Sequence, residues 1–127
     1  MSQQQFLQPQ MTEAAIHLGK NLVAAESYLR FQQAEQALND DAMALGLMNK
    51  LKQAQAHIRK AQGSGTVSAE DLQTLGNLQR QVEATPVITE YIFCQQDMIR
   101  FFQEINAEIS QLLGINFALI ARRSSCC

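Results

Sequence analysis

The 127-residue sequence has no tryptophan, two tyrosines and six phenylalanines, so aromatic residues make up only 6% of it. It also contains only two prolines and six glycines. Strands favour aromatic and β-branched residues, whereas proline and glycine mark turns. The scarcity of these residue types favours a helical protein over a sheet protein. The length fits a single domain.

Further absences exclude classes of function. The net charge is −2, so the whole chain has no electrostatic attraction to nucleic acid or to an anionic membrane. No apolar run reaches the roughly 18 residues of a membrane span, and no basic and apolar leader is visible. Three cysteines, an odd number, do not make a secreted disulfide framework. We therefore expect a cytoplasmic protein with reduced thiols and with neither direct nucleic-acid binding nor a membrane partner.

Apolar residues recur at steps of three and four along most of the chain, which predicts amphipathic helices. The first helix is expected to begin at Thr12 and to continue to about residue 38. Asp40 or Asp41 then caps a second helix, which ends in a loop over residues 62–67. Four apolar side chains are expected to be buried by the third helix: Leu72, Leu75, Leu78 and Val82.

The boundaries of the third and fourth helices carry clear capping signals. Residues 68–71 form a Ser-x-x-acid capping box, which opens the third helix. Thr85 and Pro86 then provide an N-cap and a first-turn proline for the fourth. If this last helix continues to about residue 120, it is about 50 Å long, more than the roughly 30 Å of a small domain.

The last helix carries a seam with the 4-3-4-3 spacing of coiled coils: Met98, Phe102, Ile105, Ile109 and Leu112. A helix this long needs more cover than its neighbours provide. We therefore predict an all-α protein, an elongated antiparallel bundle of about four helices that oligomerises along this seam. Its expected parts are a flexible arm at 1–11, a helical domain at 12–121 and a cysteine-containing tail at 122–127.

Two adjacent thiols, Cys126 and Cys127, end the sequence behind Arg122 and Arg123. Four alternatives are open for this pair. The two cysteines are free thiols without a role, ligands of a metal site shared between subunits, redox-active groups, or prenylation sites. Neighbouring arginines favour the thiolate form, which is the form that binds metals. Cys94 is about thirty residues upstream, roughly 45 Å along a helix. It is expected to be a small buried residue, so a shared site would need thiols from other chains.

Catalysis has no positive signal in the sequence. His17 and His57 are isolated and are expected at the surface. Asp40 and Asp41 are explained by a helix cap, and no serine has a visible His/Asp constellation around it. The sequence therefore predicts a protein that is not an enzyme.

Several short segments together resemble the YlbF/YmcA family of small helical bacterial proteins. The resemblance covers about residues 12 to 121, and the cysteine-containing end is similar to the YlbF-like branch. The matching segments are Leu18-Gly19-Lys20-Asn21-Leu22, Glu26-Ser27-Tyr28-Leu29-Arg30-Phe31-Gln32-Gln33-Ala34, Leu38-Asn39-Asp40-Asp41, Leu51-Lys52-Gln53-Ala54-Gln55, Leu75-Gly76-Asn77-Leu78, Thr85-Pro86-Val87-Ile88 with Tyr91, and Ile105-Asn106-Ala107-Glu108-Ile109-Ser110.

The resemblance implies a non-enzymatic regulatory adaptor in competence and development. Such proteins assemble with related subunits, associate with ribonuclease Y and promote maturation of messenger RNA. It also implies a 4Fe–4S cluster held partly by cysteines near the C-terminus, which points to Cys126 and Cys127. The tail departs from this pattern, because an adjacent pair supplies only some of the thiolates that a cluster needs. The alternative is a homo-oligomeric structural or interaction module with an inert tail.

Overall fold

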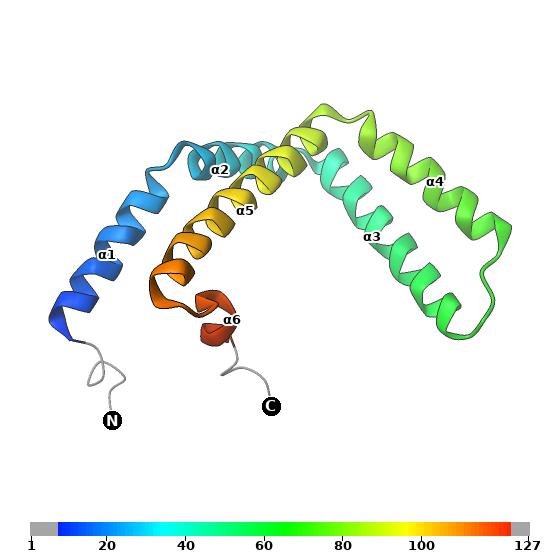
Figure 1. Cartoon of the computed structure of the whole chain (residues 1–127). Coiled ribbons are helices and arrows are strands. Elements are labelled where there is room, and N and C mark those ends of the chain that lie inside the picture. Colours follow the sequence, from blue (N-terminus) through cyan, green and yellow to red (C-terminus); the bar gives the residue numbers. More distant parts are fainter. Residues whose placement is uncertain (1–7, 123–127) are drawn as a thin grey trace, which may run out of the picture.

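The computed structural model describes residues 8–122, which contain helices and turns but no strand (Figure 1). The all-α prediction is therefore confirmed, although the number of helices differs from the expected four. None of the described helices is long and apolar enough to cross a membrane. The helices are α1 (Pro9–Val23), α2 (Glu26–Asn39), α3 (Ala42–Gly63), α4 (Ala69–Glu83), α5 (Pro86–Leu113) and α6 (Phe117–Arg122).

The helices form an arch with two limbs (Figure 1). At the top, α2 lies along the N-terminal half of α5, and the rings of Phe31 and Tyr91 meet with centroids 5.5 Å apart. The hairpin of α3 and α4 makes one limb. The other limb contains α1, the C-terminal half of α5, and α6.

The core lies where four helices meet, and each supplies one buried residue. These residues are Leu38 from α2, Ala44 from α3, Val82 from α4 and Ile88 from α5. Ile88 is completely buried, with 0% of its surface exposed. Because the cluster contains a residue from each helix, it holds the α3–α4 limb to the α2–α5 pair. The half-buried apolar residues around it are Leu45, Leu47, Met48, Leu51, Val87, Tyr91 and Ile92.

Two predicted helix caps are present. The Asp41 carboxylate accepts a hydrogen bond from the Ala44 amide at 3.0 Å, and the Ser68 hydroxyl accepts one from the Asp71 amide at 3.0 Å. Thr85 does precede α5, but its hydroxyl donates to the Gln81 carbonyl at 2.7 Å. The Thr85 side chain therefore satisfies the end of α4 rather than the start of α5.

The prediction of one helix from Thr12 to residue 38 was wrong. Ala25 has an extended backbone, with φ −69° and ψ 143°, and it separates α1 from α2. The bend lets α2 follow α5 while α1 turns into the limb (Figure 1). In addition, α1 begins at Pro9, because proline suits the first turn of a helix.

The last helix is also shorter than expected. It ends at Leu113, because Gly114 adopts the left-handed conformation, with φ 74°. The chain then turns back into α6 rather than continuing to residue 120. On α4, Val82 is buried and Leu75 and Leu78 are half-buried, as predicted, but Leu72 is 54% exposed and that prediction was wrong.

Candidate subunit interface

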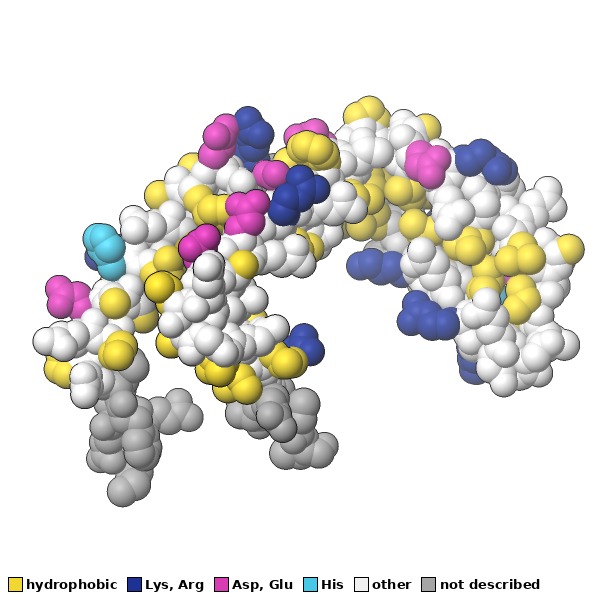
Figure 2. All heavy atoms as spheres, in the orientation of Figure 1, with side chains coloured by type: hydrophobic (Ala, Val, Ile, Leu, Met, Phe, Trp, Pro, Cys, Tyr) yellow, Lys and Arg dark blue, Asp and Glu magenta, His cyan; other side chains and the backbone are white. Residues whose placement is uncertain are grey.

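Large apolar side chains are left uncovered mainly on α1, α5, α6 and the turn between the last two. Of the exposed large hydrophobic residues that the structure describes, all but Leu29, Met43 and Leu72 lie on these elements. None of the described α1 residues is buried. Figure 2 shows hydrophobic side chains on this limb, including a group at its lower end. Large apolar side chains that gather on one part of a protein surface mark protein-binding sites.

A groove of about 260 Å³ lies between α1 and the α5–α6 corner. Leu18 and Leu22 line it from α1, and Phe102, Ile105 and Ile109 line it from α5. Asn106, Phe117 and Ala118 complete the lining. The groove is open and almost entirely apolar, so it suits an apolar side chain or helix face rather than a charged ligand.

The corner between α5 and α6 gives the groove its shape. The Ser110 hydroxyl accepts a hydrogen bond from the Phe117 amide at 2.9 Å, and the Asn106 side-chain oxygen accepts one from the Ala118 amide at 3.0 Å. The Asn116 side chain caps α6 by accepting from the Leu119 amide at 3.1 Å. These bonds satisfy amides at the start of α6 and place Phe117 in the groove.

The predicted seam divides into three environments. Phe102, Ile105 and Ile109 line the groove. Met98 is half-buried, while Leu112 is 87% exposed and lies outside the groove lining. The role of these five residues in subunit contact stays a prediction.

The α1 and α6 contributions to the groove were missed by the sequence analysis. Leu18 and Leu22 are part of the first helix's apolar stripe, a periodicity that predicts a buried face but not its partner. Phe117 was missed because α5 was expected to continue through it.

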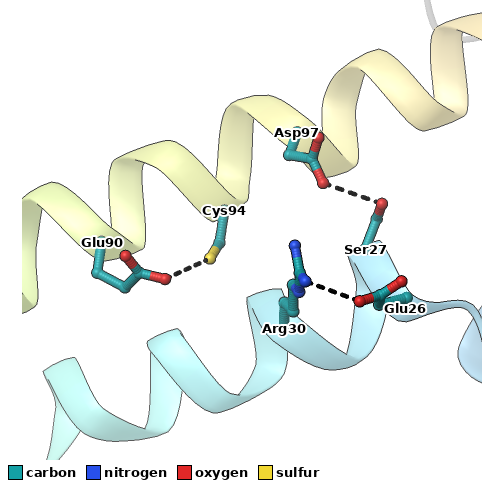
Figure 3. Close-up of polar contacts among 6 residues, drawn as sticks. All are labelled: Glu26, Ser27, Arg30, Glu90, Cys94 and Asp97. Carbon is teal, nitrogen blue, oxygen red and sulfur yellow. Dashed lines mark hydrogen bonds and ion pairs between the residues drawn. The ribbon is translucent and has the colours of Figure 1, made fainter.

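Polar side chains flank the contact between α2 and α5 (Figure 3). The Ser27 hydroxyl donates to the Asp97 carboxylate at 3.0 Å, and Arg30 pairs with Glu26 at 2.7 Å. The Cys94 thiol donates to the Glu90 carboxylate at 3.4 Å. Burial raises the pKa of Cys94, and the hydrogen bond to Glu90 raises it further. Cys94 is buried as predicted, and its raised pKa favours the neutral thiol over the thiolate.

The histidines give no metal centre in the described part of the chain. His17 is exposed, and the His57 ring lies 3.3 Å from the Asp71 carboxylate on α4. No group of three potential ligands among His, Cys, Asp and Glu occurs within residues 8–122. Cys126 and Cys127 lie outside the described residues, so their predicted role as ligands is not tested by the geometry.

The sequence was compared with known protein families, and most of it matches one family of regulators. Residues 11–113 match the family described as control of competence regulator ComK, YlbF/YmcA. The chain belongs to the YlbF/YmcA family. The resemblance seen in the sequence is therefore confirmed, and the family is one of regulators of competence. A comparison with curated protein sequences finds no match.

A solved structure shows that the helical fold of most of this chain occurs in another protein. The crystal structure of Bacillus subtilis RicA in complex with RicF is similar, with a TM-score of 0.71 and 12% sequence identity. The match covers 83% of this chain and 94% of that one. At this identity the likeness establishes the fold.

Proposed function

We propose that this YlbF/YmcA protein is a non-enzymatic regulatory adaptor that binds a related helical subunit through the limb made by α1, α5 and α6. The observation that carries the proposal is the open apolar groove between α1 and the α5–α6 corner. An amphipathic helix placed in such a groove buries its apolar face against Leu18, Phe102 and Ile109. The complex of RicA with RicF supports assembly with another protein as a property of this fold.

The size of the surface fits a stable complex only if the partner covers more than the groove. A standard protein interface buries about 800 Å² on each partner. A groove of about 260 Å³ accepts a few side chains, so it would form the centre of the interface. Exposed apolar residues of α1 and α6 outside the groove lining, including Met11 and Leu119, add to the area available.

The proposed output is control of messenger RNA processing through ribonuclease Y, and through it of competence and development. The family assignment supports the regulatory role, and the link to ribonuclease Y rests on the family resemblance. In this view the chain contributes a binding surface to a complex rather than a catalytic step.

A 4Fe–4S cluster is proposed at a site between subunits. Such a cluster requires four ligands, usually cysteine thiolates, and one chain offers the pair Cys126 and Cys127. Cys94 is a poor additional ligand because it is 3% exposed and its thiol is bonded to Glu90. One chain therefore fits half of a cluster, and other subunits would supply the remaining thiolates.

The subunit interface can be tested with two matched substitutions. Phe102→Glu places a charge in the groove, whereas Leu72→Glu places the same charge on the exposed side of the other limb. We expect Phe102→Glu to weaken binding of a co-expressed YlbF/YmcA subunit by about 30-fold or more, as for an interface hot spot. Leu72→Glu should bind like the unchanged protein.

The measurement is light scattering after size-exclusion chromatography, with circular dichroism to verify that both variants are folded. Equal complex formation by the two variants would contradict the proposed interface. If the chain instead forms an oligomer with itself, and Phe102→Glu disrupts that oligomer alone, the homo-oligomeric module is the correct function.

A further inference from the structure

Helix α3 holds four of the ten lysine and arginine residues of the sequence, without any acidic residue among them. It carries Lys50, Lys52, Arg59 and Lys60, and Ala42–Gly63 contains no aspartate or glutamate. All four side chains are exposed. Within residues 8–122, none of them forms an ion pair with another residue. These side chains are therefore accessible to a ligand, and Glu35 of α2 is an acidic residue that lines the same hollow as Lys52.

Lys52, Arg59 and Lys60 lie on the part of α3 that is turned away from α4, whereas Lys50 lines the α3–α4 junction. Ala54 is half-buried and Ile58 is buried, and both line the junction with Leu78 of α4. Lys52 and Arg59 are seven residues apart, which places them on one face about 10 Å from each other. Figure 2 shows Lys and Arg side chains spaced along the edge of α3 that borders the hollow of the arch.

The surroundings of these cations favour a nucleic acid over a protein partner. From residue 49 to residue 63, every exposed position of α3 holds a polar, basic, alanine or glycine residue. Protein interfaces need an apolar centre and contain few lysines. Contacts to phosphate and sugar, by contrast, are made by lysine, arginine, asparagine and glutamine side chains. The exposed side-chain amides close to the cations in sequence are Asn49, Gln53, Gln55 and Gln62.

We propose that the α3 face made by Lys52, Arg59 and Lys60 binds the phosphate backbone of single-stranded RNA. The choice of RNA as the polyanion rests on the proposed role in messenger RNA processing. This differs from the expectation drawn from the net charge of −2. That value averages α3 with acidic helices such as α5, which has Glu90, Asp97, Glu104 and Glu108 but one arginine.

The chemistry of this face predicts how it binds. The proposed face contains no phenylalanine, tyrosine or tryptophan, and His57 lies at the α4 junction, with its ring 3.3 Å from the Asp71 carboxylate. Phosphate contacts carry no sequence information, so binding should depend little on RNA sequence. Three neutralised phosphates give an affinity that falls about 20-fold between about 50 and 200 mM salt. The arch also leaves the α1–α5–α6 limb free for the partner subunit, because RNA and subunit would occupy different limbs.

Two charge-matched variants test the proposal. The triple variant Lys52→Gln, Arg59→Gln and Lys60→Gln removes the three positive charges of the proposed α3 face. Lys20→Gln with Arg30→Gln and Arg100→Gln removes the same net charge from α1, α2 and α5. The probe is a fluorescein-labelled single-stranded RNA of about 20 nucleotides and mixed sequence, which exceeds the usual binding-site length. Its anisotropy is followed as each full-length protein is added at low salt.

We expect the α3 variant to bind RNA at least tenfold more weakly than the unchanged protein, and the control variant to bind within about threefold of it. No RNA binding by the unchanged protein at about 50 mM salt would overturn the proposal, as would equal losses in the two variants. Binding of the partner subunit is measured for the same two variants. This measurement distinguishes the RNA-binding proposal from the proposed subunit interface. If the α3 variant loses the partner subunit but keeps RNA, α3 is a protein-binding face and the RNA proposal fails.

Discussion

At the scale of single residues, Cys94 shows how a buried position changes cysteine chemistry. Its side chain packs in the α2–α5 contact, and its thiol donates to Glu90. Burial is the largest cause that raises its pKa, and the carboxylates of Glu90 and Asp97 add to it, while Arg30 acts in the opposite direction. The folded protein therefore favours the neutral thiol at a pH where an exposed cysteine would ionise.

The sign of this shift makes a prediction about stability. Because the pKa of Cys94 is raised by folding, the folded state keeps the proton after the unfolded chain has released it. The favourable contribution of the thiol is complete below its unfolded pKa, and it is lost as the pH rises towards the folded value. We expect the difference in unfolding free energy between the unchanged protein and Cys94→Ala to narrow from about pH 7.5 to about pH 9.5.

Urea denaturation followed by circular dichroism measures both proteins at each pH. Cys94→Ala serves as the reference, because all other titrating groups are shared and cancel in the difference. A gap that stays constant, or that widens with pH, would contradict the raised pKa.

Residue-scale predictions from sequence succeeded where the physics is local. Asp41 and Ser68 cap their helices because a short polar side chain reaches an amide three residues ahead. The prediction for Leu72 failed, because a leucine at the right spacing is buried only if another helix lies over it. The partner of a helix face is a tertiary property, and periodicity does not supply it.

At the scale of helices, the two wrong boundaries differ in kind. Gly114 was visible in the sequence, and its left-handed conformation ends α5. The break at Ala25 has no such residue, since alanine is a strong helix former. The bend is explained by packing, because it lets α2 lie along α5 while α1 joins the other limb (Figure 1). Tertiary contacts of this kind override local propensity.

The same substitution should have opposite effects at two glycines. Gly114→Ala places a side chain at φ 74°, a conformation that costs roughly 1–2 kcal/mol outside glycine. Gly46→Ala lies inside α3, where a Cβ atom meets nothing within 4 Å. There alanine should stabilise the fold by about 0.5–1 kcal/mol, because it restricts the unfolded chain.

Thermal unfolding of the two variants provides the test. We expect a lower melting temperature for Gly114→Ala and a higher one for Gly46→Ala. Limited proteolysis should also cleave near α6 sooner in Gly114→Ala, because the corner made by Ser110 and Asn106 depends on that turn. Shifts of the same sign would show that the conformation at Gly114 does not control the corner.

At the scale of the whole molecule, the sequence predicted surplus apolar surface but not its shape. Three residues of the predicted seam, Phe102, Ile105 and Ile109, line the groove, and the role of the seam in subunit contact stays a prediction. The groove itself required α1 and α6 to come beside α5, which depends on the bend at Ala25 and the turn at Gly114. The run of basic residues without acidic ones in α3 can be read from the sequence, but the side of α3 left uncovered by α4 cannot.

The last prediction at this scale concerns Cys126 and Cys127. A single chain has too few thiolates for a 4Fe–4S cluster, so a cluster is expected only in a complex of several subunits. Complexes purified without oxygen, with their partner subunits, should contain iron and sulfide. The double variant Cys126→Ser with Cys127→Ser should lose both, whereas Cys94→Ala should keep them, since Cys94 is buried and bonded to Glu90. Iron and sulfide analysis, with the visible absorption of the cluster, is the measurement. Neither element in the unchanged complex, or both in the double variant, would show that the tail does not hold a cluster.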